Sequence, residues 1–119
     1  MNFDYRELEI WSRSMGLVQK IYPFLKSMPE EEKFGLVSQM KRSAVSIPSN
    51  IAEGKMRSTG KDFRLFLFRA LGSAAELETQ IEICERLALG EQYQIIEIKR
   101  EIRVIILMIQ SFISKIKIY

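Results

Sequence analysis

The sequence predicts an all-α fold in which four helices form an antiparallel up-down-up-down bundle. Apolar residues recur at spacings of three and four over four long stretches, which is the period of an α-helix. Only three prolines and six glycines interrupt the chain, and no stretch shows a competing strand pattern. The 119 residues have the length of one compact domain, and we expect residues 1–119 to form it.

The first two expected helices are separated near Pro29. Proline and the three glutamates after it suit a first helical turn, so the second helix should begin at Pro29 and end at Gly54. Pro48 removes a backbone donor inside this helix, and we expect a kink there, near Ser46. The expected core stripes are Leu8, Trp11, Met15, Val18, Tyr22 and Leu25 in the first helix, and Val37, Met40, Ala44, Ile47 and Ile51 in the second.

The third and fourth helices follow a loop and are separated near Gly90. Ser58 or Thr59 can cap the third helix, because Asp62 follows Thr59 by three residues. Sustained spacing of about 3.5 residues is typical of helices that pack nearly parallel or antiparallel. The stripes are Phe63, Leu67, Ala70, Ala74, Leu77, Ile81, Cys84 and Ala88 in the third helix, and Ile95, Ile98, Ile102, Ile105, Ile109, Phe112 and Ile116 in the fourth.

Two segments, residues 65–68 and residues 104–109, are apolar around the whole helical circumference. A helix that is apolar on every side needs a second surface to cover it. We therefore expect a homo-oligomer that uses the third and fourth helices. The alternative is that Ile and Leu are simply common helix-forming residues in this sequence.

The composition excludes several classes of site. With no histidine and one cysteine, the chain has no disulfide framework, no zinc finger and no His-activated nucleophile. A net charge of +3 permits nucleic-acid binding without requiring it. No apolar segment approaches the roughly 18 residues that span a bilayer, and the start, Met1 to Tyr5, lacks the layout of a signal peptide. We expect a cytoplasmic protein with no membrane contact.

The first candidate for phosphate contact is the loop after the second helix. It gathers Lys55, Arg57 and Lys61, and Arg64 follows one turn along, beside the free N–H groups at the start of the third helix. The alternative is a solvated loop between helices.

The second candidate is a basic cluster of Lys99, Arg100 and Arg103 on the fourth helix. Lys99 and Arg103 are four residues apart and repel each other, so a phosphate backbone, or Glu97 or Glu101, should compensate. No recognition helix is present, and no basic run is interleaved with aromatic residues as in single-strand binders. We expect no base-specific contacts.

No motif predicts an enzyme. Residues 54–62 look superficially like a phosphate-binding loop, but five residues separate the glycines and Asp62 replaces the required Ser or Thr. Glu78, Glu82 and Glu85 are interpreted as a solvated face, because carboxylate di-iron bundles also need histidine. Cys84 falls on the apolar stripe and should behave as a small hydrophobe. We expect no catalytic residue, no cofactor and no metal.

A polar stripe accompanies the apolar one on the second helix. Because buried polar groups must be hydrogen-bonded, the favoured interpretation is a network that fixes the kink and the helix register. The alternative is a binding surface. The stripe consists of Gln39, Arg42, Ser46, Asn50 and Glu53.

The part of the chain that contains this polar stripe also resembles a known protein family. QMKRSAVSIPSNIAEG, residues 39–54, closely resembles the signature of the four-helix bundle proteins called 23S rRNA-intervening sequence proteins. Leu8, Trp11 and the Ile21-Tyr22 pair match the family's first helix. FGL at residues 34–36 and ALGSAAELE at residues 70–78 extend the likeness to nearly the whole chain.

The resemblance implies a small, cytoplasmic bacterial protein that forms a homopentamer and is not an enzyme. Some members are encoded within inserts in large-subunit ribosomal RNA genes. A related branch comprises accessory proteins of diversity-generating retroelements, whose basic pentameric barrels bind nucleic acid and a reverse transcriptase.

Two functions follow as alternatives. The first is a non-enzymatic oligomer whose two basic clusters contact RNA or DNA phosphates. The second is a protein-interaction scaffold or accessory subunit that docks a partner, such as a reverse transcriptase, on the assembled ring.

Overall fold

The computed structural model describes residues 4–118. Met1, Asn2 and Phe3, on which the predicted absence of a signal peptide partly rests, lie outside the described residues, as does Tyr119. Within the described part, four α-helices form without any strand: α1 (Glu9–Leu25), α2 (Leu36–Lys55), α3 (Gly60–Arg86) and α4 (Gln92–Lys115). Two short 3-10 helices, η1 (Tyr5–Glu7) and η2 (Glu30–Glu32), precede α1 and α2. The predicted all-α class with four helices is confirmed.

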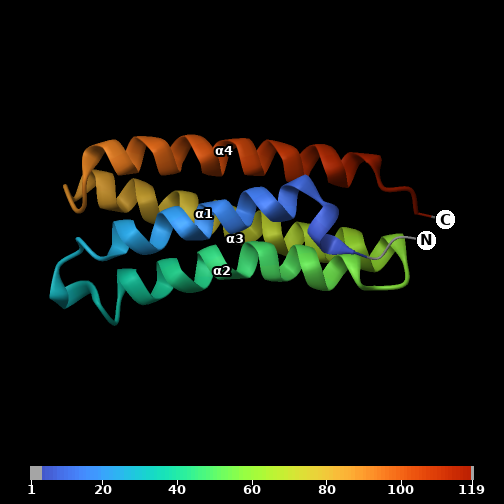
Figure 1. The fold of residues 1–119 in the computed structure, drawn as a ribbon, viewed down its shortest axis with the longest axis horizontal. Coiled ribbons are helices and arrows are strands. Elements are labelled where there is room, and N and C mark those ends of the chain that lie inside the picture. Colours follow the sequence, from blue (N-terminus) through green and yellow to red (C-terminus); the bar gives the residue numbers. More distant parts are fainter. Residues whose placement is uncertain (1–3, 119) are drawn as a thin grey trace.

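The four helices lie side by side along the long axis of a molecule that measures 48 × 22 × 20 Å (Figure 1). The α1–α2 and α3–α4 connections lie at one end of this axis (Figure 1). The α2–α3 connection lies at the other end, where the described chain also begins and ends (Figure 1). Residues 55–64 are therefore close to the C-terminal segment in space.

One hydrophobic core runs between the helices, and the stripes predicted for the last three helices face it. Met40, Ala44, Ile47 and Ile51 of α2 are fully buried. The predicted stripe of α3 is buried from Leu67 to Cys84, whereas Ala88 is exposed beyond the end of the helix. The core stripe of α4 consists of Ile95, Ile98, Ile102, Ile105 and Ile109, extended by Ile113.

The stripe predicted for α1 is wrong in part. Met15 and Tyr22 are each 40% exposed, whereas Ile10, Leu17, Ile21 and Phe24 form the buried face. Trp11, Val18 and Leu8 pack against the core from its edge. Both sets of residues recur every three or four positions, so the periodicity of α1 is compatible with either face.

The second α-helix begins at Leu36 rather than at Pro29. Pro29 instead caps the 3-10 helix of the three glutamates, and Gly35 takes φ −101° and ψ −104°, which is not a helical conformation. From Leu36 the helix continues through the buried Pro48 to Lys55 without a break in its assignment. The kink near Pro48 stays a prediction.

The ends of α3 follow the predicted signals. Thr59 caps the helix, because its Oγ1 accepts a hydrogen bond from the Asp62 N–H at 3.1 Å. After α3 the chain turns through Ala88 at φ 55° and Gly90 at φ 81°, and the Leu89 N–H donates to the Cys84 carbonyl at 2.8 Å. Left-handed residues of this kind terminate helices.

Gly54 does not cap α2 from outside the helix. It is buried within the last turn, and a Cβ added there would lie 2.6 Å from Cβ of Phe66. The glycine therefore permits the close approach of α2 to α3.

Candidate nucleic-acid interface

The basic residues of the first predicted cluster lie around the α2–α3 connection. Lys55 is the last residue of α2, Arg57 lies in the connection, and Lys61 and Arg64 belong to the first turns of α3. Arg57 and Lys61 are exposed, whereas Lys55 and Arg64 are half-buried. The Gly60 turn also touches the C-terminal segment, because a Cβ on Gly60 would lie 3.0 Å from the Lys117 carbonyl oxygen. This arrangement places the cluster at one end of the molecule (Figure 1).

Each of three cations in this cluster lies over a phenylalanine ring of α3. The Lys55 ammonium is 5.8 Å from the Phe63 ring centroid. The Arg57 guanidinium is 4.7 Å from that of Phe66, on which Arg69 also lies at 4.7 Å. Arg64 lies 5.3 Å from the ring centroid of Phe68. Stacking of this kind restricts the orientation of the cations.

One basic segment of α3 is interleaved with aromatic residues. The segment KDFRLFLFR, residues 61–69, contains three cations and three phenylalanines, and the structure brings Arg64 onto Phe68 and Arg69 onto Phe66. Arg69 and Phe68 belong to this surface and were missed. The pattern of residues 61–69 could have revealed them, but residues 65–68 within it were interpreted only as apolar helix surface.

Pairing with carboxylates differs among the four residues of the first cluster. Arg57 donates to Glu53 Oε2 at 2.8 Å, four residues before it on the helix. Neither Lys61 nor Arg64 makes an ion pair with any residue that the structure describes. The charges of Lys61 and Arg64 thus remain available to an external anion.

Two of the three cations of the second predicted cluster, Lys99 and Arg103, are neutralised by α3. Arg103 donates to both carboxylate oxygens of Glu78, at 2.7 and 2.8 Å. Lys99 donates to Glu82 at 2.8 Å and to Glu85 at 2.7 Å. The glutamates of α3 are therefore not simply a solvated face, because they form ion pairs that join α3 to α4.

Glu97 and Glu101 do not compensate Lys99 and Arg103. Glu97 pairs with Lys20 of α1, and Glu101 lies 3.6 Å from Arg13 of α1. The sequence places all four residues on one helix, but only the packed structure shows which neighbouring helix each carboxylate faces. Within this cluster, Arg100 is exposed and has no carboxylate partner among the described residues.

The ion pairs shift the pKa values of their members. Hydrogen bonds from Lys99 lower the pKa of Glu82 and of Glu85 below the ordinary value of 4.5. The same bonds raise the pKa of Lys99 above 10.5. All three groups are therefore charged at neutral pH, and the positive charge of Lys99 is neutralised within the molecule.

The polar stripe of α2 makes mainly local contacts. Ser46 Oγ donates to the Ser43 carbonyl at 2.9 Å, and Asn50 Nδ2 donates to the Ser46 carbonyl at 2.8 Å. Gln39, Arg42 and Glu53 are exposed. A buried network along the stripe is not present in the described residues.

The polar contact that does join helices in the core lies beside the stripe. Ser43 Oγ, which is buried, donates to Oε1 of the buried Gln80 at 2.9 Å. Sequence reasoning missed both residues, because each is a single polar position on an otherwise apolar face.

Cys84 is fully buried on the apolar stripe, as predicted. Burial raises the pKa of its thiol to about 11, so the nucleophilic thiolate is scarce at neutral pH. Among the described residues, no three Cys, Asp or Glu side chains are grouped in a way that could hold a metal ion. None of the described helices is both long enough and apolar enough to cross a bilayer.

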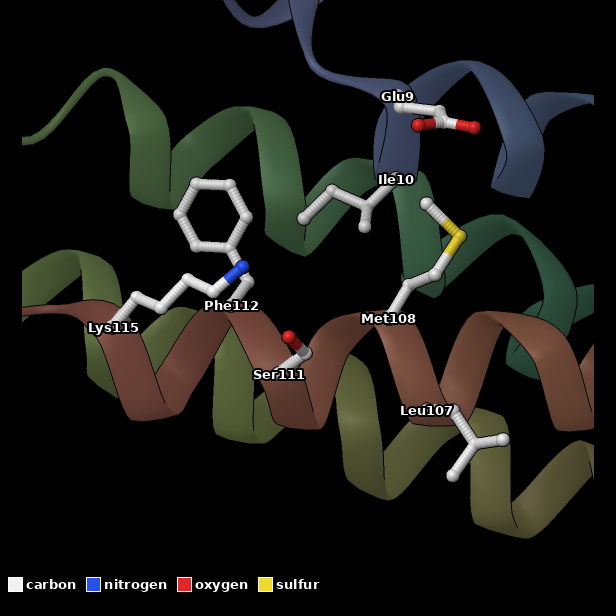
Figure 2. Close-up of a pocket in the computed structure, with 7 residues that line it drawn as sticks. All are labelled: Glu9, Ile10, Leu107, Met108, Ser111, Phe112 and Lys115. Carbon is white, nitrogen blue, oxygen red and sulfur yellow. The ribbon is translucent and has the colours of Figure 1, made fainter.

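A groove of about 410 Å³ lies between the start of α1 and the end of α4. Figure 2 shows Met108 and Phe112 rising from α4 toward Ile10 of α1, whereas Leu107 points away. Glu9, Ser111 and Lys115 complete the lining. The groove is mainly apolar and is separate from the first basic cluster.

Comparisons with known proteins agree with this architecture. The family model described as 23S rRNA-intervening sequence protein matches residues 6–111. A similar solved structure is the crystal structure of a protein with unknown function from the S23 ribosomal protein family of Bacteroides thetaiotaomicron. Its sequence is 26% identical, its TM-score is 0.82, and the match covers 89% of this chain and 99% of that chain. No curated protein matches this sequence.

Proposed function

Since the chain belongs to the 23S rRNA-intervening sequence protein family, we propose that it is a non-enzymatic, cytoplasmic, oligomeric protein that binds nucleic acid. The contacts go to the phosphate backbone and do not read base identity. The observation that carries this proposal is the pair of unpaired cations, Lys61 and Arg64, beside the stacked cations of the α2–α3 connection.

Phosphate binding follows from the way in which charge is distributed between the two clusters. Lys99 and Arg103 are paired with the glutamates of α3, so they offer little to an external phosphate, and Arg100 is left as a single unpaired cation beside them. The binding surface is therefore what we call the basic end, which adds Arg69 to the first predicted cluster. The basic end consists of Lys55, Arg57, Lys61, Arg64 and Arg69.

Oligomerisation is supported by apolar side chains on the outer faces of α3 and α4. Ile83 of α3 is 39% exposed, and Ile96 and Leu107 of α4 are 48% and 56% exposed. A homopentamer, as implied by the family resemblance, would cover part of this surface and bring several basic ends onto one particle. Antiparallel helix order is part of the same proposal, supported by connections that alternate between the two ends (Figure 1).

The test is a titration of the protein into fluorescent structured RNA and duplex DNA, followed by anisotropy at about 50 and 200 mM salt. Binding through several phosphates weakens by orders of magnitude over this range. In the double variant Lys61→Glu/Arg64→Glu, we expect binding to fall at least about tenfold, with a shallower salt dependence, because two phosphate contacts are lost.

The matched control reverses two lysines at the opposite end, in Lys26→Glu/Lys33→Glu, and should bind as the unmodified protein does. Lys33 lies beside the three glutamates of η2, where phosphate would be repelled. Equal losses in both double variants would show that net charge alone governs binding. No binding by the unmodified protein at low salt would overturn the proposal.

A protein-interaction scaffold is the second candidate, favoured by the apolar groove between α1 and α4 (Figure 2). Under this function the basic residues confer solubility. Recovery of the same protein partner by the Lys61→Glu/Arg64→Glu variant and by the unmodified protein, together with absence of nucleic-acid binding, would favour it.

A further inference from the structure

A second groove opens along the start of α3, within the basic end. It has a volume of about 380 Å³, and Ile118 of the C-terminal segment forms part of its wall. The C-terminal segment is held there by close packing, since Ile116 Cγ2 and the Lys117 carbonyl both approach Gly60. We call it the α3 groove; its lining residues are Lys61, Arg64, Leu65, Phe68 and Ile118.

Among the described residues, every charged side chain that lines the α3 groove is positive. Lys61 and Arg64 are its charged residues, and neither is paired with a carboxylate of the described chain. This contrasts with the groove between α3 and α4, where Glu78 and Glu82 face Lys99 and Arg103. Charge complementarity therefore selects an anionic occupant for the α3 groove.

The α3 groove also exposes a flat aromatic surface next to these cations. Phe68 is 47% exposed although it lies on a helix of the bundle, and Leu65 and Ile118 beside it are exposed to a similar extent. The Arg64 guanidinium lies over the ring at 5.3 Å from its centroid. Aromatic rings and guanidinium planes are the surfaces on which unpaired nucleic-acid bases stack.

One class of ligand matches both properties at once. A duplex offers phosphates but keeps its base faces stacked inside, so the exposed ring would contribute nothing to its binding. A single strand offers phosphates for the cations and free base faces for the ring. Stacking is tolerant of sequence, which agrees with the absence of a recognition helix.

We propose that the α3 groove binds single-stranded nucleic acid, with one base stacked on Phe68 and the flanking phosphates held by Lys61 and Arg64. This inference rests on the nucleic-acid binding proposed above and adds the form of nucleic acid and the residue that distinguishes it.

The experiment separates stacking from phosphate attraction. The probes are a fluorescent oligouridine strand of about twelve nucleotides, which is within the usual range for a single-strand site, and an abasic phosphodiester strand of equal length. The variant is Phe68→Leu, which removes the aromatic face and retains an apolar side chain. Circular dichroism and thermal unfolding verify that the fold is kept.

The matched control is Phe34→Leu. Phe34 is 89% exposed and lies under the Lys33 ammonium at 5.6 Å, so it resembles Phe68 with its cation, but it is next to the glutamates of η2. We expect Phe68→Leu to weaken oligouridine binding by about 5- to 150-fold, the range for loss of one stacked base. Binding of the abasic strand, and all binding by Phe34→Leu, should stay unchanged.

Several results would overturn the inference. If the unmodified protein and Phe68→Leu bind oligouridine equally well, the inference that a base stacks on Phe68 is wrong. The proposed binding of phosphates is then retained. If the unmodified protein binds neither strand at low salt but binds structured RNA or duplex DNA, this inference fails and the proposed function stands. If it binds none of these probes, both proposals fail. If Phe68→Leu changes the sedimentation of the protein without a base-dependent loss of affinity, the α3 groove is a contact between copies of this chain.

Discussion

At the residue scale, glycines of the helices occupy two different environments. Gly54 of α2 faces Phe63 and Phe66 of α3, and an added Cβ would lie 2.6 Å from the Phe66 Cβ. Gly72 of α3 has no atom within 4 Å of such a Cβ apart from its own helix. Glycine at the first position allows two helices to approach, whereas at the second it only adds backbone freedom.

We therefore predict opposite effects of alanine at these two positions. Gly54→Ala should lower the free energy of unfolding by about 1–3 kcal/mol, because an overpacked contact must force the helices apart. Gly72→Ala should raise it by about 0.5–1 kcal/mol, because alanine is the better helix former. Urea unfolding followed by circular dichroism measures both, and a neutral Gly54→Ala would contradict the close packing of α2 on α3.

At the element scale, ion pairs join α3 to α4 along their exposed side. Glu78 pairs with Arg103, and Glu82 and Glu85 share Lys99. The pKa values of Glu82 and Glu85 are lowered by Lys99, so the pairs stabilise the folded state above the ordinary glutamate pKa of 4.5. This contribution is lost as the pH falls through the lowered values.

The Lys99→Met variant should consequently show a weaker dependence of stability on acid pH. Below pH 4.5 the urea midpoint of the unmodified protein should fall more steeply than that of Lys99→Met, because the variant lacks the main cause of the lowered pKa values. At alkaline pH, the contribution of Lys99 to stability is present below pH 10.5 and is lost as the pH rises through its raised pKa.

Arg100→Met serves as the control for this pH series. Arg100 is the exposed neighbour of Lys99 on α4 and has no carboxylate partner among the described residues. Its removal should leave the acid dependence unchanged. Identical acid dependence in Lys99→Met and in the unmodified protein would mean that the pairs are too well solvated to contribute.

At the scale of the whole molecule, the bundle leaves large apolar side chains uncovered. Leu107 is 56% exposed on α4, beside the apolar groove of Figure 2. Ile83 is exposed on α3, and Ile96 is exposed on α4. Exposed apolar surface is typical of sites where proteins interact.

Leu107→Asp should therefore shift the protein to a smaller species in sedimentation or light scattering at micromolar concentration, because a charge would be buried at a contact between copies. Leu87→Asp is the matched control, since Leu87 is 62% exposed but lies in the turn after α3. If the unmodified protein is already monomeric in these measurements, the proposed oligomer is contradicted.

More of the fold than of the candidate site could be predicted from the sequence. Helix class and the buried stripes of α2, α3 and α4 followed from apolar spacing, because a helix places every third or fourth residue on one face. The Thr59 cap followed from local chemistry. The basic residues of the α2–α3 connection were found because charge is visible in sequence, whereas the phenylalanines that hold them were interpreted only as apolar surface.

Sequence alone determined what depends on neighbours along the chain: the helical period, the capping of α3, the family and the excess of basic residues. Only the tertiary structure decided which face of α1 is buried, because two apolar faces of that helix have the same period. It also decided that Lys99 and Arg103 are neutralised while Lys61 and Arg64 are not. Pairing of charges depends on distances between helices of a few ångströms, and those distances are set by packing of the core.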